Sequence, residues 1–130
     1  MKLKNLYNVE YIYNIDAGTV TAVARVERFD KNFLRFRNYY SYITGNYSKS
    51  KTVFSGVARL KAGDENNPEL AKRIARCKAL RQANNYYGNL LFKMTDGISR
   101  LMLDMSRMGI GTLCRAMSYD EEINKLTKGE

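Results

Sequence analysis

A polar and aromatic cluster in the second half of the chain has the clearest capacity for ligand binding. Its members combine aromatic rings with asparagine amides: Asn84, Asn85, Tyr86, Tyr87, Asn89 and Phe92. An aromatic plane beside a carboxamide suits an adenine base, because the ring stacks on the base and the amide offers a donor and an acceptor to its edge. The same residues would also suit an interface in which tyrosines pack and asparagines stay solvated. The sequence leaves both interpretations open.

A glycine-containing stretch forms a second candidate site. It runs Arg107-Met108-Gly109-Ile110-Gly111-Thr112, and Arg115 follows. We expect a turn here, whose glycines would let backbone N–H groups approach a phosphate while Thr112 caps the next helix or adds a hydroxyl. The arginines could bind phosphate through two hydrogen bonds each. The stretch lacks the dinucleotide-binding and Walker signatures, so a simple helix-to-helix turn remains the alternative.

Basic residues form two further sets. The first lies at helical spacing and comprises Lys72, Arg73, Arg76, Lys78 and Arg81. The second is expected on one surface of a sheet and comprises Arg25, Arg28, Arg35 and Arg37. Both sets could follow phosphates, or they could simply be solvated. The net charge of +9 favours an anionic partner: nucleic acid, an anionic membrane surface or a phosphorylated small molecule.

The composition argues against catalysis. The chain has no histidine, which removes most zinc sites, the nucleophile arrangements that need an imidazole, and the commonest general base. The two cysteines, Cys77 and Cys114, are not spaced like a metal site, and we expect them to be buried free thiols. We therefore expect no enzyme, no metal and no cofactor.

Hydropathy gives no sign of membrane insertion or export. No apolar run reaches the ~20 residues of a membrane span, and the N-terminal residues lack the apolar segment of a signal peptide. A cytoplasmic protein is the expectation.

The N-terminal half predicts a sheet. Residues 7–16 alternate between apolar and polar, and residues 19–29, 33–37 and 51–61 are further predicted strands. Residues 38–50 are rich in Tyr, Ser and Asn and predict a loop or irregular hairpin. Short turns favour antiparallel pairing. Gly56 indicates a bulge or a close approach of another element.

The C-terminal half predicts helices. The Asn67-Pro68-Glu69 stretch provides an N-cap and a proline at the first helical position. From there to about residue 94 a stripe of small residues would let a sheet or helix approach closely: Ala71, Ala75, Ala79 and Ala83. A break is expected at residues 95–97, then a helix over 98–108, the glycine turn, and a last helix from Ser118 to Leu126. The helix over 98–108 is apolar nearly all round, which predicts burial against another subunit.

The fold class is therefore α+β. We expect one domain over residues 1–130, with an antiparallel sheet over 6–61 followed by a long helix and a C-terminal helical arm over 67–126, assembled as an oligomer.

Two resemblances bear on this layout. The stretch Gly56-Val57-Ala58-Arg59-Leu60, followed by Asp64 and the run 71–80, resembles a strand-turn-helix pattern of small phage and bacterial proteins with a double-stranded-RNA-binding-like β-β-β-α core. The layout of the whole chain resembles the phage Thoeris anti-defence sponges of the first type.

The second resemblance implies a function. Members of that family hold cyclic ADP-ribose isomers without cleaving them, at sites shared between protomers, and some hold cyclic trinucleotides in separate sites of a hexamer. The resemblance implies adenine stacking by Tyr86, Tyr87 or Phe92 with Asn84 or Asn89, phosphate binding by Arg107 and Arg115 from across a subunit boundary, and a second nucleotide site at Gly109 to Thr112. Arg28 belongs to the same expected ligand-binding set.

The leading hypothesis is thus a non-enzymatic sponge for cyclic nucleotide messengers, a dimer or hexamer in the cytoplasm of an infected host cell. The first alternative is a basic nucleic-acid-binding module, which would use the helical basic residues and the sheet arginines and show a steep salt dependence. The second is a structural oligomer without a ligand.

Overall fold

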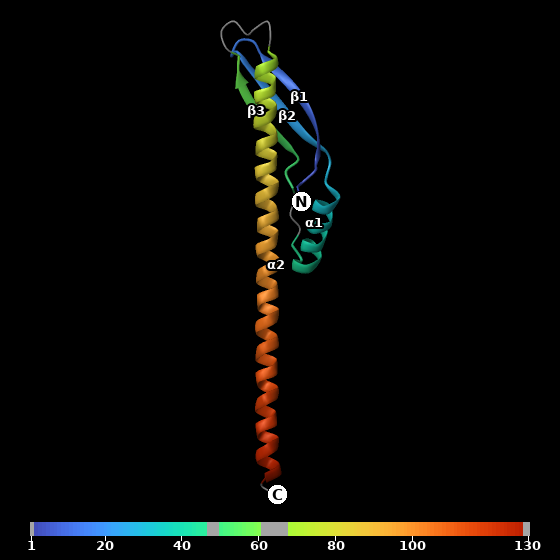
Figure 1. Cartoon of the computed structure of the whole chain (residues 1–130), viewed down its shortest axis with the longest axis vertical. Helices are drawn as coiled ribbons and strands as arrows, with labels where there is room; N and C mark the ends of the chain where they lie inside the picture. Colours follow the sequence, from blue (N-terminus) through green and yellow to red (C-terminus); the bar gives the residue numbers. More distant parts are fainter. Residues whose placement is uncertain (1, 47–49, 61–67, 129–130) are drawn as a thin grey trace. The chain divides into compact units, whose positions relative to one another are not determined.

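The computed structural model describes residues 2–46, 50–60 and 68–128 of the 130-residue chain (Figure 1). In chain order the elements are β1 (Leu6–Asn14), β2 (Thr19–Arg28), α1 (Lys31–Thr44), β3 (Val53–Arg59) and α2 (Glu69–Lys128). The strands form one antiparallel sheet in the order β1-β2-β3. The prediction of an α+β chain with an antiparallel sheet before a long helix is confirmed.

Side-chain alternation gives the sheet one buried face. In β2, Val20, Ala22 and Ala24 are fully buried, and the residues between them point to the other face. The β1–β2 connection contains Gly18 at φ +62°, and its N–H donates to the Ile15 carbonyl at 3.2 Å. Glycine adopts this left-handed conformation without a steric cost, so this short connection can join the two antiparallel strands.

The buried face of the sheet packs on the predicted alanine stripe of α2. Ala75, Ala79 and Ala83 are fully buried. A Cβ added to Gly56 of β3 would meet the backbone of Ala75 and Ala79 and would lie 2.7 Å from the Lys78 Cβ. Strand and helix are therefore in backbone contact at this glycine, and the predicted close approach is confirmed.

Aromatic rings form the second part of the core. Phe33 of α1, Phe54 of β3 and Tyr87 of α2 are buried together, with centroids 5.3 Å apart for Phe33–Tyr87 and 5.5 Å for Phe54–Tyr87. Edge-to-face packing of this kind stabilises the contact beyond the area that it buries. It joins α1, the sheet and α2.

The predicted strand over 33–37 is wrong, because these residues belong to α1. The predicted loop over 38–50 is wrong for residues 38–44, which also belong to α1. The Asp30 carboxylate accepts a hydrogen bond from the Asn32 N–H at 2.7 Å and caps the helix. Gly45 ends it at φ +71°, and its N–H donates to the Ser41 carbonyl. Residues 47–49 of the predicted loop lie outside the described residues. Among the described residues the sheet therefore has three strands in place of the four predicted, and α1 lies between β2 and β3.

The predicted helix breaks at residues 95–97 and 109–112, and the separate helix from Ser118, are also wrong. Residues 69–128 form one helix, which continues past Gly88 as predicted and then past the other glycines. The hydroxyls of Thr112 and Ser118 donate backward to the Met108 and Cys114 carbonyls, at 2.7 and 3.2 Å, so they do not cap new helices. The predicted N-cap at Asn67 and the predicted sheet end at Lys61 lie outside the described residues.

The chain divides into two compact units, Met1–Met94 and Thr95–Glu130, and α2 contributes to both. In the second unit most apolar side chains are exposed, including Met102, Met105 and Met108. Their burial against another subunit stays a prediction. Cys77 and Cys114 are free thiols, as predicted, but both are exposed in the protomer, so the prediction that they are buried is wrong.

Candidate nucleotide-binding site

One exposed face of α2 in the first unit carries the residues suited to base stacking. Asn85, Asn89 and Phe92 are exposed, and the Phe92 side chain is 74% accessible. Their spacings of three, four and seven place all three on one side of a helix. Phe92 offers an open ring on the same side of the helix as these two amides. Asn84 lies to the side, and its Nδ2 donates to the Leu80 carbonyl at 2.8 Å.

The two tyrosines of the predicted cluster have structural contacts. Tyr87 is fully buried, its hydroxyl donates to the Lys51 carbonyl at 2.5 Å, and burial raises the pKa of its phenol. The half-buried Tyr86 hydroxyl accepts from the Lys51 N–H at 2.8 Å. Both rings therefore fix the segment that enters β3. With no exposed face, Tyr87 cannot stack a base that arrives from solvent.

The second predicted group lies on α2 in the second unit. Arg107, Gly109, Gly111, Thr112 and Arg115 are all exposed. Because this stretch is helical, its backbone N–H groups bond within the helix and do not form a phosphate-binding turn. The arginine side chains remain available to an anion. The stacking face and these arginines belong to different compact units.

Arg28, the remaining predicted residue, borders a basic hollow in the first unit. The hollow has a volume of about 380 Å³ and is lined by Lys4, Arg28, Phe29, Asp30 and Lys31. Its three cationic side chains come from the segment before β1, the end of β2 and the start of α1. Sequence reasoning missed Lys4 and Lys31, because only the fold brings these distant positions together.

Asp30 is the acidic group of the hollow. Its carboxylate accepts hydrogen bonds from the Lys4 and Asn32 N–H groups, at 2.8 and 2.7 Å, and these bonds lower its pKa. The ionised carboxylate is thus held in place by the backbone. A carboxylate has about four acceptor sites, so it could also accept from a ligand hydroxyl.

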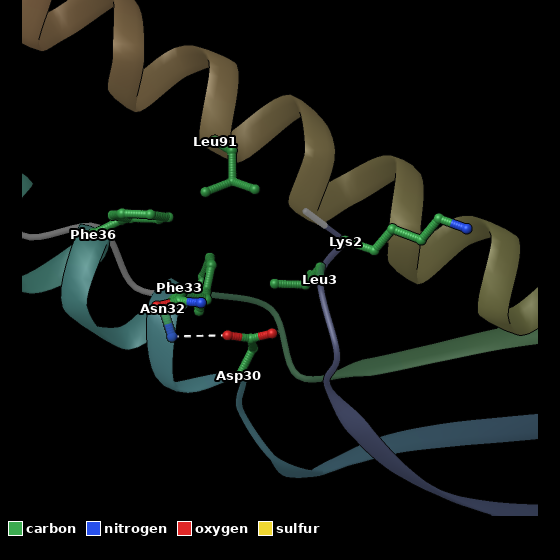
Figure 2. A pocket seen from close by; sticks show the side chains of 7 residues that line it. All are labelled: Lys2, Leu3, Asp30, Asn32, Phe33, Phe36 and Leu91. Carbon is green, nitrogen blue, oxygen red and sulfur yellow. Dashed lines mark hydrogen bonds between the residues drawn. The ribbon is translucent and has the colours of Figure 1, made fainter.

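A small apolar cavity adjoins the hollow and shares Asp30 with it. In Figure 2 the side chains of Leu3, Phe33, Phe36 and Leu91 surround the space, and Lys2 points away from it. Its volume of about 90 Å³ is well below the roughly 300 Å³ at which small-molecule pockets begin. It is too small for a nucleotide.

The described residues contain no group of three or more Cys, Asp and Glu side chains that could hold a metal ion. None of the helices, in the parts that are described, has the length and apolar content of a membrane span. No protein-family model matches the chain, and no curated protein sequence matches it significantly. The described side chains offer cationic groups to an anion and the exposed aromatic ring of Phe92 to a stacking partner.

Proposed function

We propose that the protein is a non-enzymatic homo-oligomer that binds a cyclic nucleotide, such as a cyclic ADP-ribose isomer or a cyclic oligonucleotide, and holds it intact. The observation that carries the proposal is the basic hollow, which Lys4, Arg28 and Lys31 line together. In an infected cell such a protein would act as a phage anti-defence sponge, withholding the messenger from its Thoeris effector in the cytoplasm.

The hollow suits the phosphates and ribose of such a ligand. A guanidinium binds a phosphate through two parallel hydrogen bonds, and the lysines add compact positive charges. The fixed carboxylate of Asp30 can accept a hydrogen bond from a ribose hydroxyl. The volume of about 380 Å³ falls within the range of small-molecule pockets.

Phe92 supplies the stacking surface. Its ring is 74% exposed and lies on the same helix face as Asn85 and Asn89. The base would stack on the ring while an amide reads its edge. Among the predicted aromatic candidates, Phe92 is therefore the one we assign.

The second unit supports assembly. Between residues 102 and 117 its exposed large apolar side chains are Met102, Leu103, Met105, Met108, Ile110, Leu113 and Met117. At about 100° per residue these positions cover well over half of the helix circumference, more than one helical neighbour would hide. Packing between copies would bury them and bring Arg107 and Arg115 of one copy to a partner's ligand, as in the expected shared site.

The test is calorimetric titration of the purified protein, at moderate salt, with cyclic ADP-ribose isomers, a cyclic trinucleotide and a short RNA duplex. We expect tight binding of a cyclic nucleotide that is recovered intact after denaturation. Arg28→Ala should weaken binding by about tenfold or more, because it removes a charge-assisted hydrogen-bonding partner. Arg59→Ala, which removes an exposed arginine from the opposite face of the sheet, is the matched control.

Arg115→Ala should abolish retention of the cyclic nucleotide and leave the oligomer intact. Equal retention by variant and parent would remove Arg115 from the site. Binding of the duplex alone would instead favour the nucleic-acid-binding alternative, which the exposed Arg73, Arg76 and Arg81 support.

A further inference from the structure

The first turns of α2 carry a surface groove that the nucleotide site does not use. The groove, here named the basic face, has a volume of about 480 Å³ and is lined by Leu70, Arg73, Ile74, Cys77, Lys78 and Arg81. We infer that the basic face binds the acidic segment of α2, residues 119–126, from a second copy of the chain. The inference rests on the oligomer of the proposed function but not on its ligand.

The basic face combines apolar and cationic groups. Leu70 is 55% exposed and Ile74 40% exposed, although both lie in a well-packed unit. Arg73 and Arg81 are exposed, and the described part of the chain offers neither of them an ion-pair partner. The Lys78 ammonium donates to the Val57 carbonyl at 3.0 Å, which holds its charge at the rim. A fitting partner therefore has an apolar stripe flanked by carboxylates.

The acidic segment has this composition. Asp120, Glu121 and Glu122 are consecutive, and their directions spread over about 200° of the helix circumference. Tyr119, Ile123 and Leu126 are 59%, 55% and 67% exposed, and their spacing of four and three puts them on one side. Because acids flank that side, one surface of the segment offers both apolar and negative groups. The two surfaces are complementary in charge and in polarity.

Binding of a second copy would cover both the basic face and the acidic segment, whereas binding of nucleic acid would involve only the basic face. A phosphate backbone would neutralise the arginines but leave Leu70 and Ile74 exposed, and it would repel the acidic segment. Parallel pairing of two helices in register is disfavoured, since it would set Arg73 and Arg81 opposite their own counterparts. Exchange of unlike segments avoids this repulsion and gives each copy two contacts in a symmetric pair.

Charge exchange tests the inference in the full-length protein. One variant carries Arg73→Glu and Arg81→Glu, and the other carries Asp120→Lys, Glu121→Lys and Glu122→Lys. Sedimentation velocity at moderate salt should show that each variant alone associates about tenfold or more weakly than the parent, because like charges now face each other. An equimolar mixture should associate again, since each variant supplies what the other has lost.

Matched controls keep the result interpretable. Far-ultraviolet circular dichroism should show unchanged helix content, and Arg25→Glu with Arg59→Glu, on the exposed face of the sheet, should leave association unchanged. Unaltered association of either charge variant would overturn the inference. A second result would also overturn it: the mixture fails to associate, whereas a single chain that carries all five substitutions regains the association of the parent. The contact would then lie within one chain.

Two further outcomes separate this contact from the other proposals. If the arginine variant associates normally but loses affinity for a short RNA duplex, the basic face is a nucleic-acid surface and the inference fails. If charge exchange restores association but calorimetry detects no cyclic nucleotide binding by the parent, the contact stands and the proposed ligand fails.

Discussion

The two parts of α2 differ in what they present. Within Met1–Met94 the helix turns a stripe of alanines to the sheet, and Ala75, Ala79 and Ala83 are fully buried. Within Thr95–Glu130 it carries large flexible side chains, and Met102, Met105 and Met108 are 62%, 67% and 75% exposed. One helix therefore combines a face of small residues that is already covered with large residues that are not.

The difference relates the size of the side chains to whether their packing partner lies inside or outside the protomer. Alanine leaves the helix backbone accessible, so a strand with glycine at the facing position can come into backbone contact. Methionine is unbranched and polarisable and adapts to surfaces of varied shape. The covered part thus has a partner fixed by the fold, and the exposed part suits a partner outside the protomer.

The largest expected effect comes from filling the contact between β3 and α2. Gly56→Val places a branched side chain where a Cβ alone would collide with the backbone of Ala75 and Ala79. We expect a loss of about 3 kcal/mol or more in the free energy of unfolding, because overpacking forces the backbones apart. Urea unfolding followed by the near-ultraviolet signal of the buried Tyr87 measures this change.

Gly56→Ala should lie between parent and Gly56→Val in stability. A stable Gly56→Val protein with unchanged cooperativity would mean that the strand does not approach the helix as described. The first part of α2 would then not be covered as tightly by the sheet, and it would differ less from the second part.

The next effect falls on the other part of α2. Met102→Ser with Met105→Ser removes two exposed apolar side chains that share one helix face. If that face is buried between copies, association should weaken by about 2 kcal/mol or more, while the unfolding of the first unit stays unchanged. Sedimentation equilibrium measures the association. Full retention of association would show that this face meets no partner.

The sequence predicted the sheet and its contact with α2 because the signals were local. Alternation in β1 and β2 marked the strands, and the alanine stripe with Gly56 indicated a close approach. The stretch 33–37 was misassigned because its apolar residues fit either period. What decided for a helix was the cap from Asp30 and the packing of Phe33 on Tyr87, and these contacts exist only in the folded chain.

The predicted helix breaks were wrong because glycines and hydroxyl residues often end helices but do not always do so. A single glycine costs a helix only about 1 kcal/mol, which neighbouring turns can offset. For the site, the sequence located the aromatic cluster but could not tell which tyrosine faces the core. It also could not place Lys4 and Lys31 beside Arg28, since charges from separate elements meet only through tertiary structure.

Glycine-to-alanine changes should affect the two parts of α2 differently. An added Cβ at Gly88 or Gly109 meets nothing within 4 Å in the protomer, so each alanine should favour the helix by about 1 kcal/mol. Gly88→Ala should therefore raise stability without altering association. Gly109 lies four residues from Met105 and seven from Met102, on the side of the helix that carries these exposed methionines. Gly109→Ala should therefore weaken association if helices approach closely there. Identical association of both variants would place Gly109 outside any contact between copies.

The smallest expected effect is a pH-dependent change in the stability of the first unit. The Lys4 and Asn32 N–H groups hold the pKa of Asp30 below its ordinary value of about 3.9, so the fold favours the ionised carboxylate. Its contribution is complete above that value and disappears as the pH falls through the lowered folded-state pKa.

Asp30→Asn should therefore melt at a lower temperature than the parent at pH 7, and the difference should shrink below about pH 4. Thermal melts of parent and variant at a series of pH values measure it, and the subtraction removes the other carboxylates. Asp104→Asn, which changes an exposed carboxylate of the second unit, should match the parent throughout. A difference for Asp30→Asn that stays constant down to pH 2 would mean that the charge of the cap does not stabilise α1. The packing of Phe33 on Tyr87 would then be what holds α1 against the covered part of α2.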